Sequence, residues 1–96
     1  HKQYRSPTDQ ERAALEGLAK ALHNMPNDAD AETLQNQVFS IGKEHEFSQL
    51  RDWFKALYEI LLGQSQGPRF GSFIALFGKD ETANLIERAL EGKVNS

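Results

Sequence analysis

The sequence predicts an all-α fold, a single compact bundle of about five helices. Apolar residues recur at helical spacing in five separate stretches, and each stretch is bounded by capping residues, glycine or proline. No stretch has a convincing strand pattern. The length of 96 residues fits one domain with a single modest core.

The first helix is expected over residues 9–24. Thr8 and Glu11 have the spacing of a capping box, in which each side chain accepts the backbone N–H of the other residue. A proline two residues beyond this stretch disfavours further helix. The second helix is expected to open at the N-cap Asp30 and to stop near Glu44, with its apolar residues on one face.

The third helix has the strongest helical pattern. Ser48 is expected to cap its start, and Gly63 supplies the left-handed residue that helix ends favour. Its apolar face follows the i, i+3, i+4, i+7 rule and comprises Leu50, Trp53, Phe54, Leu57, Ile60 and Leu61. Seven of the nine aromatic residues lie between residues 47 and 77, so the third and fourth helices should form the centre of the fold.

The last two helices follow a turn-rich link. Pro68 is expected at the first position of the fourth helix, where its missing N–H costs nothing, and Gly78 closes that helix. The fourth helix should lie in the core because its pattern is very apolar, with Phe70, Phe73, Ile74 and Phe77. The fifth helix is expected to take Asp80 as its N-cap and to end at Gly92.

The ends of the sequence predict how the chain is organised. The start has neither an initiator methionine nor an apolar signal region, so it is expected to lie inside a longer chain. We expect a flexible remnant of a linker at residues 1–7, the helical domain at 8–92 and a frayed tail at 93–96. No run of 18 apolar residues exists, so no membrane span is expected, and the lack of cysteine fits a cytoplasmic protein.

The composition argues against catalysis and against a metal site. Without cysteine there is no thiolate nucleophile and no sulfur-ligated zinc. His1, His23 and His45 are isolated, and the two glutamates beside His45 point away from it on a helix. No glycine-rich phosphate loop is present. We therefore expect no catalytic residue, no metal and no cofactor in this chain.

The charge is unevenly distributed along the sequence. The net charge is −3, which argues against capture of nucleic acid by the domain as a whole. Residues 1–48 carry five bases and eight acids, whereas residues 49–96 carry six of each. Between Ile60 and Lys79 there is no acid at all, so an anionic partner should meet that stretch first.

Residues 61–73, which read LLGQSQGPRFGSF, carry the clearest chemistry. Arg69 is expected in the first turn of a helix, where the helix dipole disfavours a cation. Together with exposed N–H groups at that helix start, its guanidinium would suit a phosphate or a base edge. Gln64 and Gln66 can both donate and accept hydrogen bonds, and Tyr58 lies off the apolar stripe, where its ring could stack on an unpaired base.

A structural interpretation of the same stretch stays open. The glycine-proline pair would then be an ordinary turn. Arg69 would form an ion pair with a carboxylate such as Glu59 or Asp52. Gly71 would serve a close contact between helices, whereas the functional interpretation uses its missing side chain for the approach of a flat base.

Residues 50–76, LRDWFKALYEILLGQSQGPRFGSFIAL, with the continuation FGKDETANLIERAL, resemble the C-terminal region of class I lysyl-tRNA synthetases. The most specific part is LLGQ followed by GPRFGSF, and the upstream block DADAETLQNQVFSIGKEH is also similar to that family. The likeness covers roughly residues 8–92. In that family this region is a compact helical bundle, called an α-helix cage, that binds the anticodon of lysine tRNA.

The resemblance implies that ATP binding and lysine activation belong to an N-terminal catalytic domain, because the signature motifs of that domain are absent here. This chain would be catalytically silent and would have two partners: the anticodon loop of lysine tRNA and the catalytic domain of the same polypeptide. The residues expected to contact the RNA are Tyr58, Gln64, Gln66, Arg69, Phe70, Ser72 and Lys79.

Two other functions stay open at this point. An acidic helical bundle can act as a protein-interaction or docking module that makes no contact with RNA. It can also be a helical cap that only stabilises its parent enzyme. A long exposed apolar groove would favour the docking module.

Overall fold

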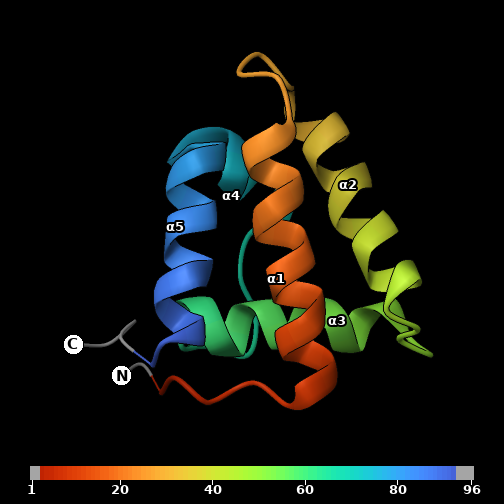
Figure 1. The fold of residues 1–96 in the computed structure, drawn as a ribbon, viewed down its shortest axis with the longest axis vertical. Coiled ribbons are helices and arrows are strands. Elements are labelled where there is room, and N and C mark those ends of the chain that lie inside the picture. The colour runs from red at the N-terminus through yellow and green to blue at the C-terminus, as the bar shows by residue number, and fades with distance from the viewer. Residues whose placement is uncertain (1–2, 93–96) are drawn as a thin grey trace.

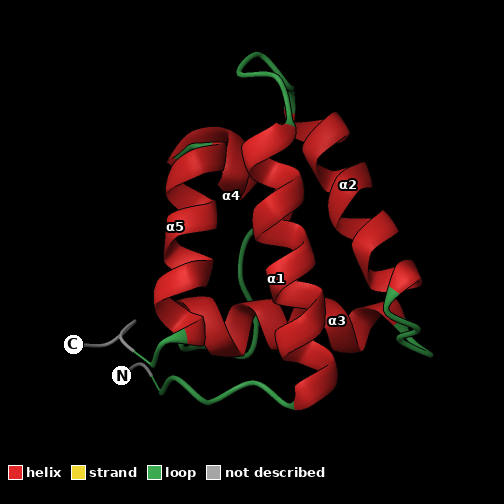
Figure 2. Cartoon of the chain, in the orientation of Figure 1, coloured by secondary structure: helices red, strands yellow, loops and turns green. Residues whose placement is uncertain are grey.

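The computed structural model describes residues 3–92, and its helices confirm the all-α prediction. Within this range Figure 2 shows helices and loops but no strand. A π-helix, η1, directly follows the third α-helix. The elements in chain order are α1 (Asp9–Asn24), α2 (Ala31–Glu44), α3 (Leu50–Leu57), η1 (Tyr58–Leu62), α4 (Phe70–Phe77) and α5 (Lys79–Leu90).

The helices pack in two main pairs. α1 packs most extensively against α5, and α2 packs most extensively against α4. In Figure 1, α1, α2 and α5 stand side by side, while α3 and η1 lie across their lower ends. The chain that follows η1 rises behind α1 in this view and reaches α4 at the upper end of the molecule.

Trp53 lies at the centre of the core. Its side chain has no exposed surface, and its Nε1 donates a hydrogen bond to the Val38 carbonyl oxygen at 2.9 Å. Gly42 makes room for the indole, because a Cβ at this position would stand 2.6 Å from Trp53 Cδ1. The other large side chains that are almost completely buried are Leu15, Leu18, Leu22, Leu34, Val38, Leu57, Ile60, Leu61, Phe70, Ile74 and Ile86.

The starts of α1 and α2 are as predicted. In α1 the Glu11 N–H donates to Thr8 Oγ1 at 3.2 Å, and the Thr8 N–H donates to Glu11 Oε1 at 2.9 Å, which completes the capping box. In α2 the Thr33 N–H donates to Asp30 Oδ1 at 2.8 Å. Both helices therefore begin where the sequence places a side chain that accepts an otherwise unpaired N–H.

The predicted caps of α3 and α5 are wrong. The N-cap of α3 is Gln49, one residue after Ser48, and no side chain caps it. α5 begins at Lys79, directly after Gly78, so Asp80 lies inside the first turn and is not the N-cap. The Asp80 carboxylate instead contacts His23 on α1 and its neighbour Lys79, at 2.8 and 3.1 Å.

The predicted start and depth of α4 are also corrected. Arg69 is the N-cap with an extended backbone, so Pro68 precedes the helix and does not occupy its first position. Only one face of α4 is buried, and the helix packs mainly against α2 and less extensively against α5. At its end the side chains of Leu76 and Phe77 are 92 % and 46 % exposed, so the helix does not lie wholly in the core.

The segment before α1 lies against η1. The backbone N–H of Gln3 donates to the carbonyl oxygen of Gly63 at 2.9 Å. Arg5 forms ion pairs with Glu11 and Glu59. Residues 3–7, which we call the strap, therefore connect the start of α1 to the end of η1, whereas the tail expected at 93–96 lies outside the described residues.

Candidate nucleic-acid interface

The loop of residues 63–69 is held at both of its ends. Gly63 has φ 69° and ψ 29°, the left-handed conformation predicted for it, and this turns the chain out of η1. Near the other end, the Tyr58 hydroxyl donates to the Pro68 carbonyl oxygen at 2.7 Å. Gly67 lies against the same ring, since a Cβ there would stand 3.0 Å from Tyr58 Cδ1. The exposed side chains between these ends therefore stand on a fixed backbone.

An aromatic hollow of about 500 Å³ lies on one side of this loop. Phe54 and Tyr58, both partly buried, contribute its ring surfaces. Burial raises the pKa of the Tyr58 hydroxyl above its ordinary value, so it remains a donor at neutral pH. The hollow is lined by Arg51, Asp52, Phe54, Lys55 and Tyr58 from α3 and η1, and by Ser65 and Gln66 from the loop.

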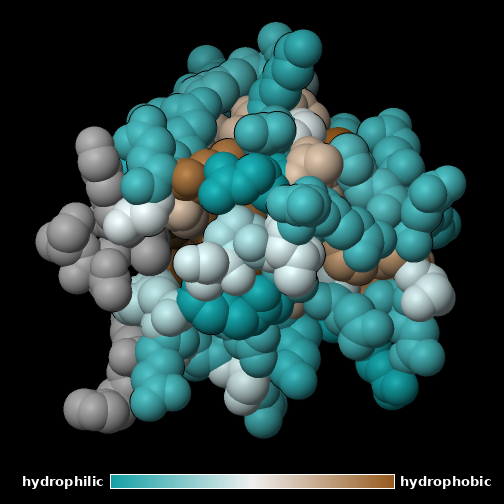
Figure 3. All heavy atoms as spheres, turned by 60° about the horizontal axis from the view of Figure 1, so that its bottom comes forward, coloured by the Kyte–Doolittle hydropathy of each residue, from teal (hydrophilic) through white to brown (hydrophobic). Residues whose placement is uncertain are grey.

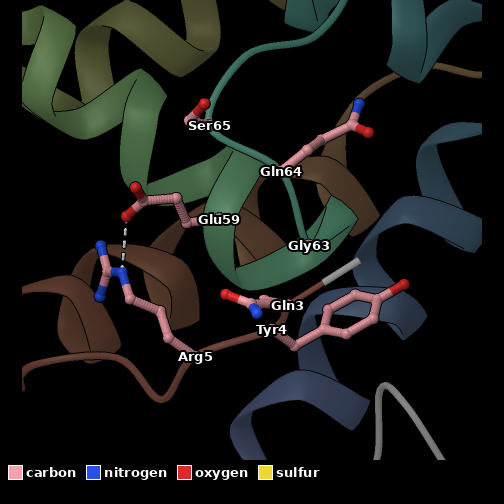
Figure 4. Close-up of a pocket in the computed structure, with 7 residues that line it drawn as sticks. All are labelled: Gln3, Tyr4, Arg5, Glu59, Gly63, Gln64 and Ser65. Atoms are coloured by element: carbon pink, nitrogen blue, oxygen red, sulfur yellow. Dashed lines mark hydrogen bonds and ion pairs between the residues drawn. The ribbon is translucent and has the colours of Figure 1, made fainter. Parts of the chain in front are cut away.

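A polar hollow of about 550 Å³ lies on the other side of the loop and is shown in Figure 4. The strap and η1 form its walls, and Figure 4 shows Arg5 reaching toward Glu59. Ser65 lines both hollows, so the loop forms a ridge between them. The lining residues are Gln3, Tyr4, Arg5, Glu59, Gly63, Gln64 and Ser65.

Electrostatics differ between the two hollows. In the polar hollow Arg5 Nε lies 2.7 Å from Glu59 Oε1, and its Nη1 lies 2.7 Å from Glu11 Oε1. The hydrogen bonds that Arg5 donates to Glu11 and to Glu59 raise the pKa of its guanidinium, and the bond to Arg5 lowers the pKa of the Glu11 carboxyl. In the aromatic hollow the Arg51 guanidinium makes no ion pair within residues 3–92.

Four of the predicted RNA contacts lie on or beside the loop with exposed side chains: Gln64, Gln66, Arg69 and Ser72. Arg69 forms no ion pair with another described residue, and Glu59 is taken by Arg5. The ion pair of Arg69 with Glu59 or Asp52, which the structural interpretation expects, is therefore absent from residues 3–92. Tyr58, the fifth predicted residue, lines the aromatic hollow.

Two of the predicted contacts do not join this group. Phe70 has no exposed surface, and its ring packs against Tyr58 and Phe73 at centroid distances of 6.2 and 5.3 Å. Its ring therefore belongs to the core and we leave it out of the interface. Lys79 follows the other end of α4, where its side chain is largely covered and its Nζ lies 3.1 Å from Asp80 Oδ1.

One N–H group at the start of α4 is already bonded within the fold. The Gly71 N–H donates to Gln35 Oε1 of α2 at 2.6 Å, in a buried position. A Cβ on Gly71 would collide with the carbonyl oxygen of Ala31 and would lie 2.7 Å from Gln35 Cβ. Gly71 thus serves the packing of α4 on α2, as the structural interpretation expected, and no base can approach it.

Five residues that line the aromatic hollow were not among the predicted contacts: Arg51, Asp52, Phe54, Lys55 and Ser65. The apolar pattern of the third helix had placed Phe54 in the core. With Tyr58, the residues Arg51, Phe54 and Lys55 occupy positions i, i+3, i+4 and i+7, which lie on one face of a helix. That spacing, next to a loop with two glutamines, is the signal that could have identified them.

No cluster of metal ligands occurs within residues 3–92. His23 contacts the carboxylates of Asp80 and Glu87 at 2.8 and 3.4 Å, which joins α1 to α5. None of the described helices is long and apolar enough to cross a bilayer. Figure 3 brings the lower end of Figure 1 forward and shows a mostly hydrophilic surface broken by small apolar areas.

An exposed polar loop beside an aromatic hollow is an arrangement on which an unpaired base could stack. The chain is a member of the anticodon binding domain family, whose model matches residues 1–90. The family resemblance is thus confirmed for an anticodon-binding domain.

Its relatives include lysine–tRNA ligases. That of Roseobacter denitrificans is 53% identical over 95 residues, which cover 99% of this chain and 18% of the relative. That of Rickettsia bellii is 44% identical over 90 residues, which cover 94% of this chain and 17% of the relative. The chain therefore spans less than a fifth of the length of these relatives. No solved structure matches it.

Proposed function

We propose that this chain is the anticodon-binding domain of a class I lysine–tRNA ligase and that it recognises the anticodon loop of lysine tRNA. The observation that carries the proposal is the family match over residues 1–90, combined with lysine–tRNA ligase relatives that align with nearly the whole chain. The segments LLGQ and GPRFGSF support the class I assignment.

The aromatic hollow supports a stacking mechanism for one unpaired base. The rings of Phe54 and Tyr58 line it, and a base that stacks on such a ring gains about 1 to 3 kcal/mol. Because stacking is similar for all bases, it supplies affinity more than identity. The hydrogen bond from the Tyr58 hydroxyl to the Pro68 carbonyl oxygen fixes the ring relative to the loop. Little conformational entropy is therefore lost when RNA binds.

The loop side chains supply base identity. A lysine anticodon is rich in uridine, whose edge offers carbonyl acceptors and one N–H donor. The Gln66 amide lines the same hollow and can donate and accept at once, so it can match that edge. Gln64 offers the same chemistry on the other side of the loop, in the polar hollow. Ser72 adds a hydroxyl in the first turn of α4.

Arg51, Lys55 and Arg69 supply phosphate contacts. All three side chains are exposed around the loop. The sequence has no acid between Ile60 and Lys79. A net charge of −3 is compatible with RNA binding because phosphates interact with local charges within a Debye length, which is about 8 Å at physiological salt. The remaining tRNA affinity, ATP binding and lysine attachment are assigned to the rest of the ligase, in the cytoplasm.

Binding of a fluorescent anticodon stem–loop of lysine tRNA to the full-length ligase tests this proposal. The protein should prefer the lysine loop to a scrambled loop on the same stem. Arg69→Ala should weaken binding about eightfold at roughly 50 mM salt, because one phosphate contact to a single strand is lost. Gln66→Ala should reduce the preference for the lysine loop over the scrambled loop, because the base can still stack on the rings but loses its hydrogen bonds to the Gln66 amide.

Lys20→Ala is the matched control. It removes one exposed base on α1, which lines a separate hollow with Arg12 and Glu87, and it should leave stem–loop binding unchanged. Circular dichroism melts should show that each variant folds. Equal affinity for the two loops would contradict the proposed function, and a large drop in the melting temperature of Arg69→Ala would return this residue to a structural role.

A second candidate, a docking module, is favoured by one observation. Leu76 is 92 % exposed and stands beside the half-exposed Phe77, so the two side chains form an apolar patch at the end of α4. If docking of this patch on the rest of the ligase is the main role, Leu76→Ser should lower tRNA charging, whereas Gln66→Ala and Arg69→Ala should not.

A further inference from the structure

Glu59 is the acid closest in sequence to the 63–69 loop, and it lines the polar hollow. It follows Tyr58, a residue of the aromatic hollow, and it stands four positions after Lys55. A free carboxylate at this place would repel RNA phosphates on either side of the loop. How Glu59 is neutralised therefore bears directly on RNA binding.

Arg5 of the strap forms an ion pair with this carboxylate. Its Nε lies 2.7 Å from Glu59 Oε1, and its side chain is 37% exposed while that of Glu59 is 25% exposed. The remaining guanidinium nitrogens bind Glu11, with Nη1 to Oε1 at 2.7 Å and Nη2 to Oε2 at 3.0 Å. Arg5 is thus fixed between two carboxylates, and its bond to Glu59 is partly shielded from solvent.

Lys55 competes for the same carboxylate from the other side. Its Nζ lies 4.0 Å from Glu59 Oε2, the limit of an ion pair, and its side chain is 60% exposed. The two residues are spaced i,i+4 on one helical face, where such pairs form readily. With Arg5 bound to Oε1, the Lys55 ammonium stays largely in solvent at the edge of the aromatic hollow.

We propose that Arg5 is a positioning residue for RNA binding: by pairing with Glu59, it leaves Lys55 available to a phosphate of the RNA bound over the aromatic hollow. This inference rests on the proposed function. Without Arg5, the Glu59 carboxylate closes on Lys55 and withdraws the ammonium from the RNA. The strap then matters to the interface although Arg5 itself touches no base.

The test compares three variants of the full-length ligase with the lysine stem–loop as probe. Arg5→Ala should weaken binding about eightfold at roughly 50 mM salt and lower the slope of log K against log salt by about 0.7, as expected for one lost phosphate contact. Lys55→Ala should show the same loss. The double variant Arg5→Ala with Glu59→Gln should bind within about twofold of the wild type, since no carboxylate remains to hold Lys55.

Recovery of binding by the double variant distinguishes a positioning role of Arg5 from a purely structural one. If Arg5 only holds the strap in place, the double variant has lost this support as well. It should then bind as weakly as Arg5→Ala, and Arg5→Ala should have the same salt slope as the wild type. That result, or full binding by Arg5→Ala, would overturn the inference. Lys20→Ala again controls for the loss of one positive charge. A wild-type ligase that does not distinguish the lysine loop from a scrambled one would instead contradict the proposed function.

Discussion

Gln35 shows how one buried polar side chain organises the region behind the interface. It lies on α2, yet its Oε1 accepts the Gly71 N–H in the first turn of α4 at 2.6 Å. The cap residue of α4, Arg69, offers no side-chain hydrogen bond of its own. A tertiary contact therefore replaces the local cap and leaves the Arg69 side chain free to project into solvent.

We expect Gln35→Leu to lower the free energy of unfolding by about 1 to 3 kcal/mol. The substitution removes the acceptor and leaves the Gly71 N–H buried without a partner. Chemical denaturation followed by circular dichroism measures this change. Asn36→Leu, on the exposed side of the same helix, is the control and should change the value by no more than about 0.5 kcal/mol. Equal effects of both substitutions would argue against the cap.

The same residue explains a limit of sequence reasoning. A glutamine within a helix gives no sign that it will cap a different helix 36 positions further along the chain. Phe70 shows the opposite case: its place in an apolar pattern predicted the core, where the structure puts it, although it was also among the expected RNA contacts. Burial depends on which face of a short helix meets its neighbours, and the pattern of α4 is apolar on nearly every side.

At the scale of elements, local side-chain chemistry decides which boundaries can be predicted. The starts of α1 and α2 followed from Thr8, Glu11 and Asp30, because each cap is closed by a bond between residues three positions apart. α3, α4 and α5 begin without any side-chain cap, so the nearest serine, proline and aspartate were misleading. Tertiary contacts set these starts.

Thr8→Ala should destabilise the chain by about 1 kcal/mol. The substitution removes the hydroxyl that accepts the Glu11 N–H, one of the first N–H groups of α1. Thr8→Ser keeps the acceptor and should lie close to the wild type. Thermal melts of both variants check the prediction, and an equal loss in the two would show that the methyl group, and not the cap, matters.

The π-helix η1 was not predicted. The sequence pattern predicted one continuous α-helix up to Gly63, and the apolar residues among 58–62 indeed follow helical spacing. The N–H of Gly63 reaches back to the carbonyl oxygen of Tyr58, five residues earlier, which widens the last turn. Periodicity alone cannot distinguish this turn from an α-helical one, because one extra residue shifts only the final positions.

At the scale of the whole molecule, charge pairs connect the strap, α1 and η1. Arg5 lowers the pKa of Glu11 below its ordinary value of 4.5, mainly through their hydrogen bond. A carboxyl with a lowered folded-state pKa contributes stability above its unfolded pKa, and the contribution is lost as the pH falls through the folded-state value. We therefore expect the melting temperature to fall as the pH drops below about 4.5.

Glu11→Gln tests the source of this acid sensitivity. The variant should melt at a lower temperature than the wild type at pH 7, and the difference should shrink as the pH falls through the lowered folded-state pKa of Glu11. Some acid sensitivity should remain, because hydrogen bonds also lower the pKa values of Asp30 and Asp80. Glu16→Gln, an exposed change on α1, is the control. A constant difference between Glu11→Gln and wild type across this pH range would contradict the assignment.

Some features of the interface could be predicted from the sequence, and others could not. The position of the 63–69 loop followed from its glycines and proline, and the lack of acids between Ile60 and Lys79 followed from simple counting. The two hollows did not follow, because they depend on how the strap and α3 meet the loop across the fold. Lys79 lies apart from the loop because the eight residues of α4 separate it from Arg69.

The extra residue of η1 has a consequence for how sequences of this family can diverge in length. Removing one residue between Tyr58 and Leu62 would restore a regular α-helix, but it would rotate Gly63 by about 100° about the helix axis. The strap would then lose its bond to Gly63, and Pro68 would move away from Tyr58. Insertions and deletions should therefore be rejected within η1.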